Sequence, residues 1–168
     1  LVFQETNAGV LTPEEFAQLF GQIAPIHSFH ITFLELMKRE VDNWPGPVQI
    51  GLAFNKCYQF LKIYADHIKS FDSGYATTLA TNKPAFANWF LHYPNLSLND
   101  LNSKLITPVQ RIPRYVMLLQ EIFKNTPESH VDYSSLNKAL EKMRDVAEYV
   151  NEKKRIAENL NQVNAVQE

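Results

Sequence analysis

The chain has 168 residues, of which 45% are hydrophobic, and its formal net charge is −2. These values indicate one domain with a sizeable core, and they exclude a disordered segment and a strongly basic, nucleic-acid-binding protein. The single cysteine excludes a disulfide framework, and without a membrane-spanning run or a secretory signal we expect a cytoplasmic domain that meets membranes only through neighbouring domains, if it has them.

Glycine is scarce, with five in the chain, and hairpin dipeptides such as Asn-Gly are absent, which predicts an all-α domain. The first strong helix start is at Thr12, which can serve as the N-cap. Pro13 then stands at the first helical position and Glu15 completes a capping box. The helical pattern continues to about Val41, with Pro25 as a candidate for a bend.

Downstream of the connection 44–47, apolar residues at helical spacing predict further helices. In the first of these, Phe60, Leu61 and Tyr64 are expected to face inward. Ser97 offers a second N-cap, and Asp132 is expected to cap the last helix. The predicted ranges in chain order are 48–71, 75–82, 84–91, 101–124 and 132–160.

The stretch 101–124 has the most informative pattern, because it breaks a local rule. Its apolar residues follow one helical stripe, yet Pro108 and Pro113 both stand inside that stripe. A proline in a helix interior costs roughly 3 kcal/mol, and such violations tend to mark functional or strained sites. Three polar residues within about one turn are expected to crowd one part of the surface: Gln110, Arg111 and Arg114.

Two histidines and the single cysteine are the residues that could indicate an enzyme. His27 and His30 stand three apart on one predicted helix and could present two imidazoles to a metal, as a metal-dependent hydrolase would require. No carboxylate or cysteine stands at a partner spacing, so packed or surface histidines are the simpler interpretation. There is no phosphate-binding glycine loop and no nucleophile elbow. Cys57 lies on an apolar stripe, where an inert thiol is expected.

The run 107–115, TPVQRIPRY, followed by two leucines at 118 and 119, strongly resembles the characteristic segment of Dbl homology (DH) domains. These domains are the guanine nucleotide exchange factors of Rho-family GTPases. Residues 132–152 resemble the last long helix of the same domain, and residues 11–34 resemble its early part. The resemblance covers roughly residues 1–160, and we expect 161–168 to be the frayed end of the last helix.

The resemblance implies an elongated helical bundle that grips the switch regions of a Rho-family GTPase. Such a domain promotes the release of GDP without making or breaking a covalent bond, so it is not an enzyme in the strict sense. No cofactor and no metal are expected. The rival interpretation is a non-catalytic DH-like scaffold, which binds a GTPase or another protein without nucleotide exchange.

The resemblance also implies which residues contact the GTPase. Arg114 matches a basic position, often lysine, that contacts switch 2. Asn151 matches an asparagine that hydrogen-bonds to switch 2, and Glu158, two turns further, matches a second contact position. Gln110 and Arg111 belong to the family signature and are expected to be at least half structural.

Ile106 matches the position at which the family senses an aromatic residue on the GTPase sheet. Rac-like GTPases carry tryptophan there and Cdc-type GTPases carry phenylalanine. An isoleucine tends to accompany acceptance of tryptophan, because a β-branched side chain is stiff at χ1 and shapes a different pocket from leucine. A Rac-like partner is therefore favoured. The alternative is that Ile106 is a core residue beside Leu105.

The chain departs from the family pattern at its beginning. The family's first helix begins well before the position that matches Leu1, and it carries a glutamate that engages switch 1. Glu5 stands too close to Thr12 to match that glutamate. We therefore expect 1–160 to be a DH domain that lacks most of its first helix and part of its exchange surface. A pleckstrin homology domain, which commonly follows in the family, is not present in the sequence.

Overall fold

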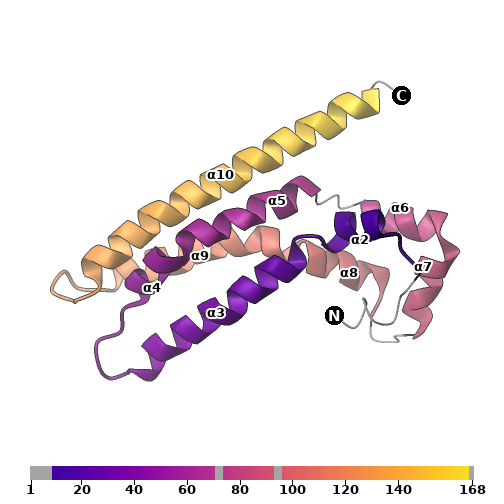
Figure 1. Ribbon diagram of the computed structural model, residues 1–168. Helices are drawn as coiled ribbons and strands as arrows, with labels where there is room; N and C mark the ends of the chain where they lie inside the picture. Colours follow the sequence, from indigo (N-terminus) through magenta and orange to yellow (C-terminus); the bar gives the residue numbers. More distant parts are fainter. Residues whose placement is uncertain (1–8, 71–73, 93–95, 167–168) are drawn as a thin grey trace.

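The computed structural model describes residues 9–70, 74–92 and 96–166, except for the side chains of residues 69, 70, 157, 158 and 160–166. Every regular element within these ranges is a helix, which confirms the predicted all-α class. The helices form an elongated bundle with a cluster of shorter helices at one end (Figure 1). Among the described residues, no helix is long and apolar enough to cross a membrane.

The longest helix, α10, extends along one side of the molecule and packs against α4, α5 and α9. The elements in chain order are α2 (Pro13–Phe20), α3 (Ile23–Asp42), α4 (Ile50–Cys57), the 3₁₀ helix η1 (Tyr58–Lys62), α5 (Ile63–Ser70), α6 (Tyr75–Asn82), α7 (Pro84–Trp89), the 3₁₀ helix η2 (Phe90–His92), α8 (Leu98–Leu105), α9 (Thr107–Lys124) and α10 (Tyr133–Val166).

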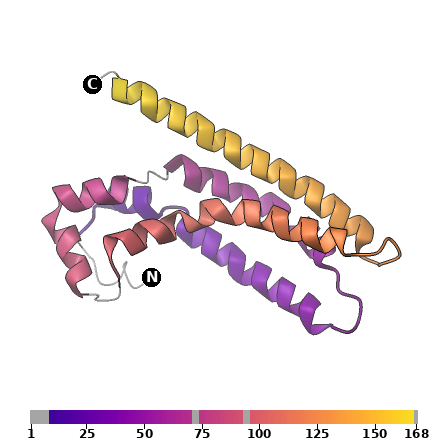
Figure 2. The ribbon, with the colours of Figure 1, turned by 180° about the vertical axis from the view of Figure 1, so that it is seen from behind.

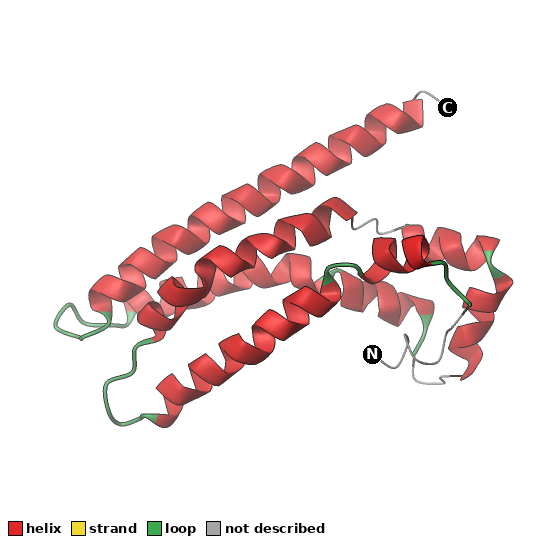
Figure 3. Cartoon of the chain, in the orientation of Figure 1, coloured by secondary structure: helices red, strands yellow, loops and turns green. Residues whose placement is uncertain are grey.

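The capping box at Thr12 is confirmed, but the helix that it starts is shorter than predicted. The backbone N–H of Thr12 donates to the Glu15 carboxylate at 2.7 Å, and the N–H of Glu15 donates back to the Thr12 hydroxyl at 3.3 Å. The chain then breaks between α2 and α3, at Gly21 and Gln22, instead of bending at Pro25 (Figure 3). Pro25 lies in the first turn of α3, where a backbone N–H has no partner within the helix and a proline is tolerated.

The segment predicted as one helix over 48–71 is two α-helices joined by the 3₁₀ helix η1. A 3₁₀ helix has three residues per turn, so it changes the face on which the following side chains lie. Leu61 and Tyr64 are buried as predicted, whereas Phe60, which was expected inside, is 63% exposed. The end predicted at residue 71 lies outside the described residues.

The segment 101–124 also divides, into the last part of α8 and the whole of α9, with Ile106 between them. Ser97 caps α8 as predicted, because its hydroxyl accepts from the N–H of Asp100 at 3.1 Å. Pro108 consequently lies in the first turn of α9, where its missing N–H costs little. Pro113 lies inside α9, so it is the proline of this pair that breaks the local rule.

Two hydrophobic clusters hold the bundle together. The main cluster is built from α3, α4, η1, α5, α9 and α10, with α10 packed against α4, η1, α5 and α9 and α3 packed against α4 and α5. Figure 2 shows α9 running between α3 and α10 in the view from behind. Its largest fully buried members include Tyr64, Leu61, Ile112, Leu136 and Met143. The second cluster joins the short helices at the other end through Leu19, Leu79, Phe86 and Leu105.

Asp132 stands immediately before α10, but its side chain caps a different helix from the one predicted. Its carboxylate accepts from the backbone N–H groups of Gly51 at 2.6 Å and Leu52 at 3.1 Å, both in the first turn of α4. Gln49, the N-cap of α4, makes no capping bond with its side chain, so these N–H groups need an external partner. Burial raises the pKa of Asp132, and the two donated bonds oppose that rise.

Candidate functional site

Two of the predicted contact residues share one exposed face of α9. Gln110 and Arg114 stand four residues apart, and Arg114 Nη2 donates to Gln110 Oε1 over a long distance of 3.5 Å. On the other side of α9, Ile112 and Leu119 are buried in the main core. The polar pair is therefore presented to solvent by a helix that the core holds firmly.

Arg111 lies on another side of the same helix, because neighbouring residues of an α-helix differ by about 100°. Its guanidinium carbon is 5.8 Å from the centroid of the Tyr115 ring. It also lines a groove of about 380 Å³ between α3 and α9, whose walls are mainly apolar and include Leu34 and Leu118. Gln110, Arg111 and Arg114 were predicted to share one part of the surface. Gln110 and Arg114 do so, whereas Arg111 faces α3.

Ile106 occupies the junction between α8 and α9. Its N–H donates to the carbonyl of Asn102 at 3.2 Å, and its own carbonyl accepts from the N–H of Gln110 at 3.4 Å. Leu105 beside it is buried in the second cluster, while the side chain of Ile106 is only half-buried. Among the described residues, Ile106 is a member of neither cluster, which weighs against the alternative that it is simply a core residue.

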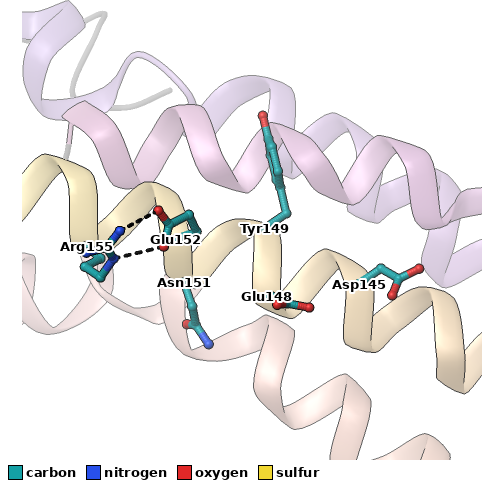
Figure 4. A pocket seen from close by; sticks show the side chains of 6 residues that line it. All are labelled: Asp145, Glu148, Tyr149, Asn151, Glu152 and Arg155. Carbon is teal, nitrogen blue, oxygen red and sulfur yellow. Dashed lines mark hydrogen bonds and ion pairs between the residues drawn. The ribbon is translucent and has the colours of Figure 1, made fainter.

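Asn151 lies on α10 and is exposed, although the preceding residue, Val150, is buried in the main core. It lines an open hollow along this helix, and Figure 4 shows its side chain on the opposite side of α10 from Tyr149. The ring of Tyr149 lies towards η1, since Lys62 Nζ is 5.6 Å from its centroid. Glu158 belongs to the same helix, but its side chain is outside the described residues.

The hollow beside Asn151 is mostly acidic. Three carboxylates line it, from Asp145, Glu148 and Glu152, together with one guanidinium, from Arg155. Arg155 donates to both oxygens of Glu152 at 2.9 and 2.8 Å, which lowers the pKa of Glu152. The α9 face therefore presents positive charge and the α10 face presents mainly negative charge, an arrangement that suits a partner surface with both signs.

The two histidines weighed as metal ligands lie in different surroundings. His27 is exposed, whereas the imidazole of His30 is half-buried and contacts the hydroxyl groups of Tyr64 and Tyr115. No group of three metal-binding side chains gathers within the described part of the chain. Cys57 is half-buried, and burial raises the pKa of its thiol, as expected for an inert cysteine.

Sequence reasoning did not find the contact that joins His30 to the two tyrosines. These residues come from α3, α5 and α9, so their separation in sequence is 34 and 85 positions. The available signal was a polar ring on an apolar helical stripe, which does not identify a partner on another helix.

The model of the RhoGEF domain family matches residues 2–151. The chain belongs to the RhoGEF domain family. The "Guanine exchange factor for Rac 30" of Dictyostelium discoideum is 43% identical over 98% of this chain, and the "Rac guanine nucleotide exchange factor JJ" of the same organism is 34% identical over 87%. The matched regions are 10% and 12% of those two proteins, so this domain spans about a tenth of their length.

Solved structures confirm the DH fold of this RhoGEF domain. The crystal structure of the DH domain of FARP2 has a TM-score of 0.73 at 21% identity, with 99% of this chain and 82% of that chain covered. The DH/PH domains of PDZ-RhoGEF, solved in complex with activated RhoA, have a TM-score of 0.77 at 23% identity, with 97% and 48% covered.

Proposed function

We propose that this RhoGEF domain is a guanine nucleotide exchange factor for a Rho-family GTPase, with a Rac-like partner favoured. The observation that carries the proposal is the exposed pair Gln110 and Arg114 in the signature segment of α9, held by a buried core behind it. Relatives described as Rac exchange factors support the choice of partner. A cytoplasmic location follows as part of the proposal, because exchange draws on the GTP of that compartment.

The proposed mechanism involves no covalent chemistry. A surface that binds the nucleotide-free GTPase more tightly than the GDP-bound form weakens the binding of GDP by the same free energy. Arg114 offers a planar fork of donors to a carboxylate or carbonyl of switch 2. Asn151 can donate and accept with one amide, which suits a backbone segment, and Glu158 is proposed as a further contact on the same helix.

The experiment that tests the proposal is release of fluorescent GDP from a panel of Rho-, Rac- and Cdc-type GTPases. We expect faster release with this domain, most strongly from a Rac-like member. A domain that binds one of these GTPases without accelerating release would instead be the non-catalytic scaffold. Failure to bind any nucleotide-free member of the panel would contradict both alternatives.

We expect faster exchange from a chain that is extended at its N-terminus by a first helix of the DH type. The groove between α3 and α9 supports this prediction, because its apolar rim is open: Leu34 is 54% and Leu118 is 59% exposed. A helix that covered the groove would bury this rim, and it would also supply the glutamate contact with switch 1. GDP release should be compared for both chains at equal folded concentration. Equal rates would contradict the role given to that helix.

Ile106→Leu should change the preference between GTPases. Leucine removes the branch at Cβ and gives the junction of α8 and α9 a different shape, and one such change in an apolar pocket is worth roughly 1–3 kcal/mol. We expect the ratio of release rates on Rac-like and Cdc-type GTPases to fall about tenfold. Leu105→Ile, at the buried neighbour, is the control and should leave the ratio unchanged. An unaltered ratio in Ile106→Leu would mean that Ile106 does not sense the partner.

A further inference from the structure

His30 connects three helices through a single imidazole ring. Its Nε2 is hydrogen-bonded to the hydroxyl of Tyr64 on α5, and its Nδ1 lies 3.4 Å from the hydroxyl of Tyr115 on α9. The rings of Phe29 and Phe33 pack beside it, with centroids at 5.1 and 6.1 Å. A neutral imidazole has one donor and one acceptor, and a tyrosine hydroxyl can fill either role, so one ring can satisfy both contacts.

The neutral form of His30 is the one that its surroundings favour. Burial lowers the pKa of this histidine, and the nearby positive charge of Arg111 and the proximity of His27 act in the same direction. The hydroxyl of Tyr64 in turn needs this partner, because Tyr64 is 1% exposed and an unpaired buried hydroxyl is costly. The contact is therefore a polar link inside an otherwise aromatic part of the core.

The turn of α9 next to Tyr115 is weakened by its own sequence. Pro113 has no N–H, so it cannot donate to the carbonyl of Val109 as other helical residues would. This same turn carries Arg111, and Arg114 follows the proline directly. Tyr115 stands next to Arg114, and its ring lies beneath the guanidinium of Arg111. The contact of His30 with Tyr115 therefore acts beside a turn of α9 that lacks one backbone hydrogen bond.

We infer that His30 is a positioning residue of the exchange surface: by holding the hydroxyl of Tyr115, it fixes the turn of α9 that carries Arg111 and Arg114. The inference rests on the proposed exchange function. His30 is half-buried and lines the groove between α3 and α9, but both nitrogens of its ring contact the hydroxyls of Tyr64 and Tyr115. The role assigned to it is therefore to position Tyr115 and not to contact the partner. Its effect passes through Tyr115 to Arg114, which is exposed, and to Arg111, which lines the groove between α3 and α9.

Four variants test this inference. His30→Phe keeps an aromatic ring but removes both contacts, Tyr115→Phe removes only the contact with α9, and His30→Gln retains a donor and an acceptor. Tyr64→Phe is the matched control, because it removes one hydroxyl from the same imidazole on the side away from α9. GDP release from a Rac-like GTPase and amide hydrogen exchange of the free domain are measured for each.

We expect His30→Phe and Tyr115→Phe each to slow GDP release on the order of tenfold, because small misplacements of binding groups have effects of this size or larger. The double variant should be no slower than either single variant, His30→Gln should recover most of the rate, and Tyr64→Phe should stay within about twofold. Independent, multiplying effects of the two substitutions would overturn the inference. A normal rate of GDP release per folded molecule in Tyr115→Phe would also overturn the inference. This variant loses only one oxygen atom, so it can be tested even if His30→Phe does not fold.

Amide hydrogen exchange is measured on the free domain without a GTPase. It therefore tests the positioning role of His30 independently of the proposed nucleotide exchange function. In His30→Phe and Tyr115→Phe, residues 109–116 should exchange faster than in the parent domain, while residues 117–124 of the same helix should not. Unchanged protection in both variants would overturn the positioning role. If the parent domain releases no GDP but protection is lost selectively in the first range, the proposed function fails and the structural link through Tyr115 stands.

Discussion

Arg114→Ala and Asn151→Ala are each expected to slow GDP release about thirtyfold, because an anchoring contact at the centre of an interface is worth about 2 kcal/mol. Both side chains are exposed, and Arg114 donates a long hydrogen bond of 3.5 Å to Gln110. Exposed substitutions of this kind usually change the free energy of unfolding by less than about 0.5 kcal/mol. Release rates should therefore fall while the melting temperature stays nearly constant.

The same helices offer matched controls. Lys124 is an exposed basic residue in the last turn of α9, and Asn137 is an exposed asparagine near the start of α10. Asn137→Ala removes the same amide group as Asn151→Ala, and Lys124→Ala removes a positive charge from α9 as Arg114→Ala does. Both positions lie away from the proposed surface, so GDP release should be normal. Arg114→Ala and Asn151→Ala could instead lower the stability of the domain and leave the rate of GDP release per folded molecule unchanged. That result would make these residues structural, and the proposed contacts would be wrong.

Gly51→Ala is expected to destabilise the domain by about 3 kcal/mol, which corresponds to roughly 10 °C in melting temperature. A Cβ atom at this position would lie 2.3 Å from the backbone nitrogen of Leu136 and 2.5 Å from the carbonyl carbon of Ser135. These are backbone atoms of α10, so α4 has to move as a whole. Such a movement would also stretch the bonds that Asp132 accepts from Gly51 and Leu52.

Denaturant unfolding of Gly51→Ala, followed by circular dichroism, measures this loss. Lys56→Ala, on the exposed side of the same helix, is the control and should change the free energy of unfolding by less than about 0.5 kcal/mol. If Gly51→Ala unfolds at the same denaturant concentration as the parent, α4 and α10 can separate at no cost. The close approach at Gly51 would then not contribute to the bundle.

The fold class and the helix starts were predictable from the sequence because they depend on local chemistry. A capping box involves residues three apart, so Thr12 with Glu15 and Ser97 with Asp100 can be identified without a fold. The contact residues Arg114 and Asn151 have a different basis. Helical spacing predicts that they lie on helices, but only the resemblance to DH domains distinguishes them from other exposed polar residues.

The helix boundaries were less predictable, because apolar periodicity continues across a break. The divisions at Gly21 and Ile106 and the tighter winding of η1 each leave an apolar residue every three or four positions. A stripe of this kind predicts a buried face, and it does not distinguish one helix from two that pack against the same core. The exposed Phe60 is the residue at which this ambiguity produced a wrong prediction.

The sequence by itself determined an all-α domain, its two capping boxes and the signature segment, because these are properties of neighbouring residues. Only the tertiary structure decided that Asp132 caps α4 and that His30 joins Tyr64 to Tyr115, through contacts 81, 34 and 85 positions apart. A buried polar group needs a partner, and its own segment does not specify where that partner lies. The packing of whole helices brings the two groups together, and for His30 it does so on α9, next to residues that are proposed to bind the GTPase.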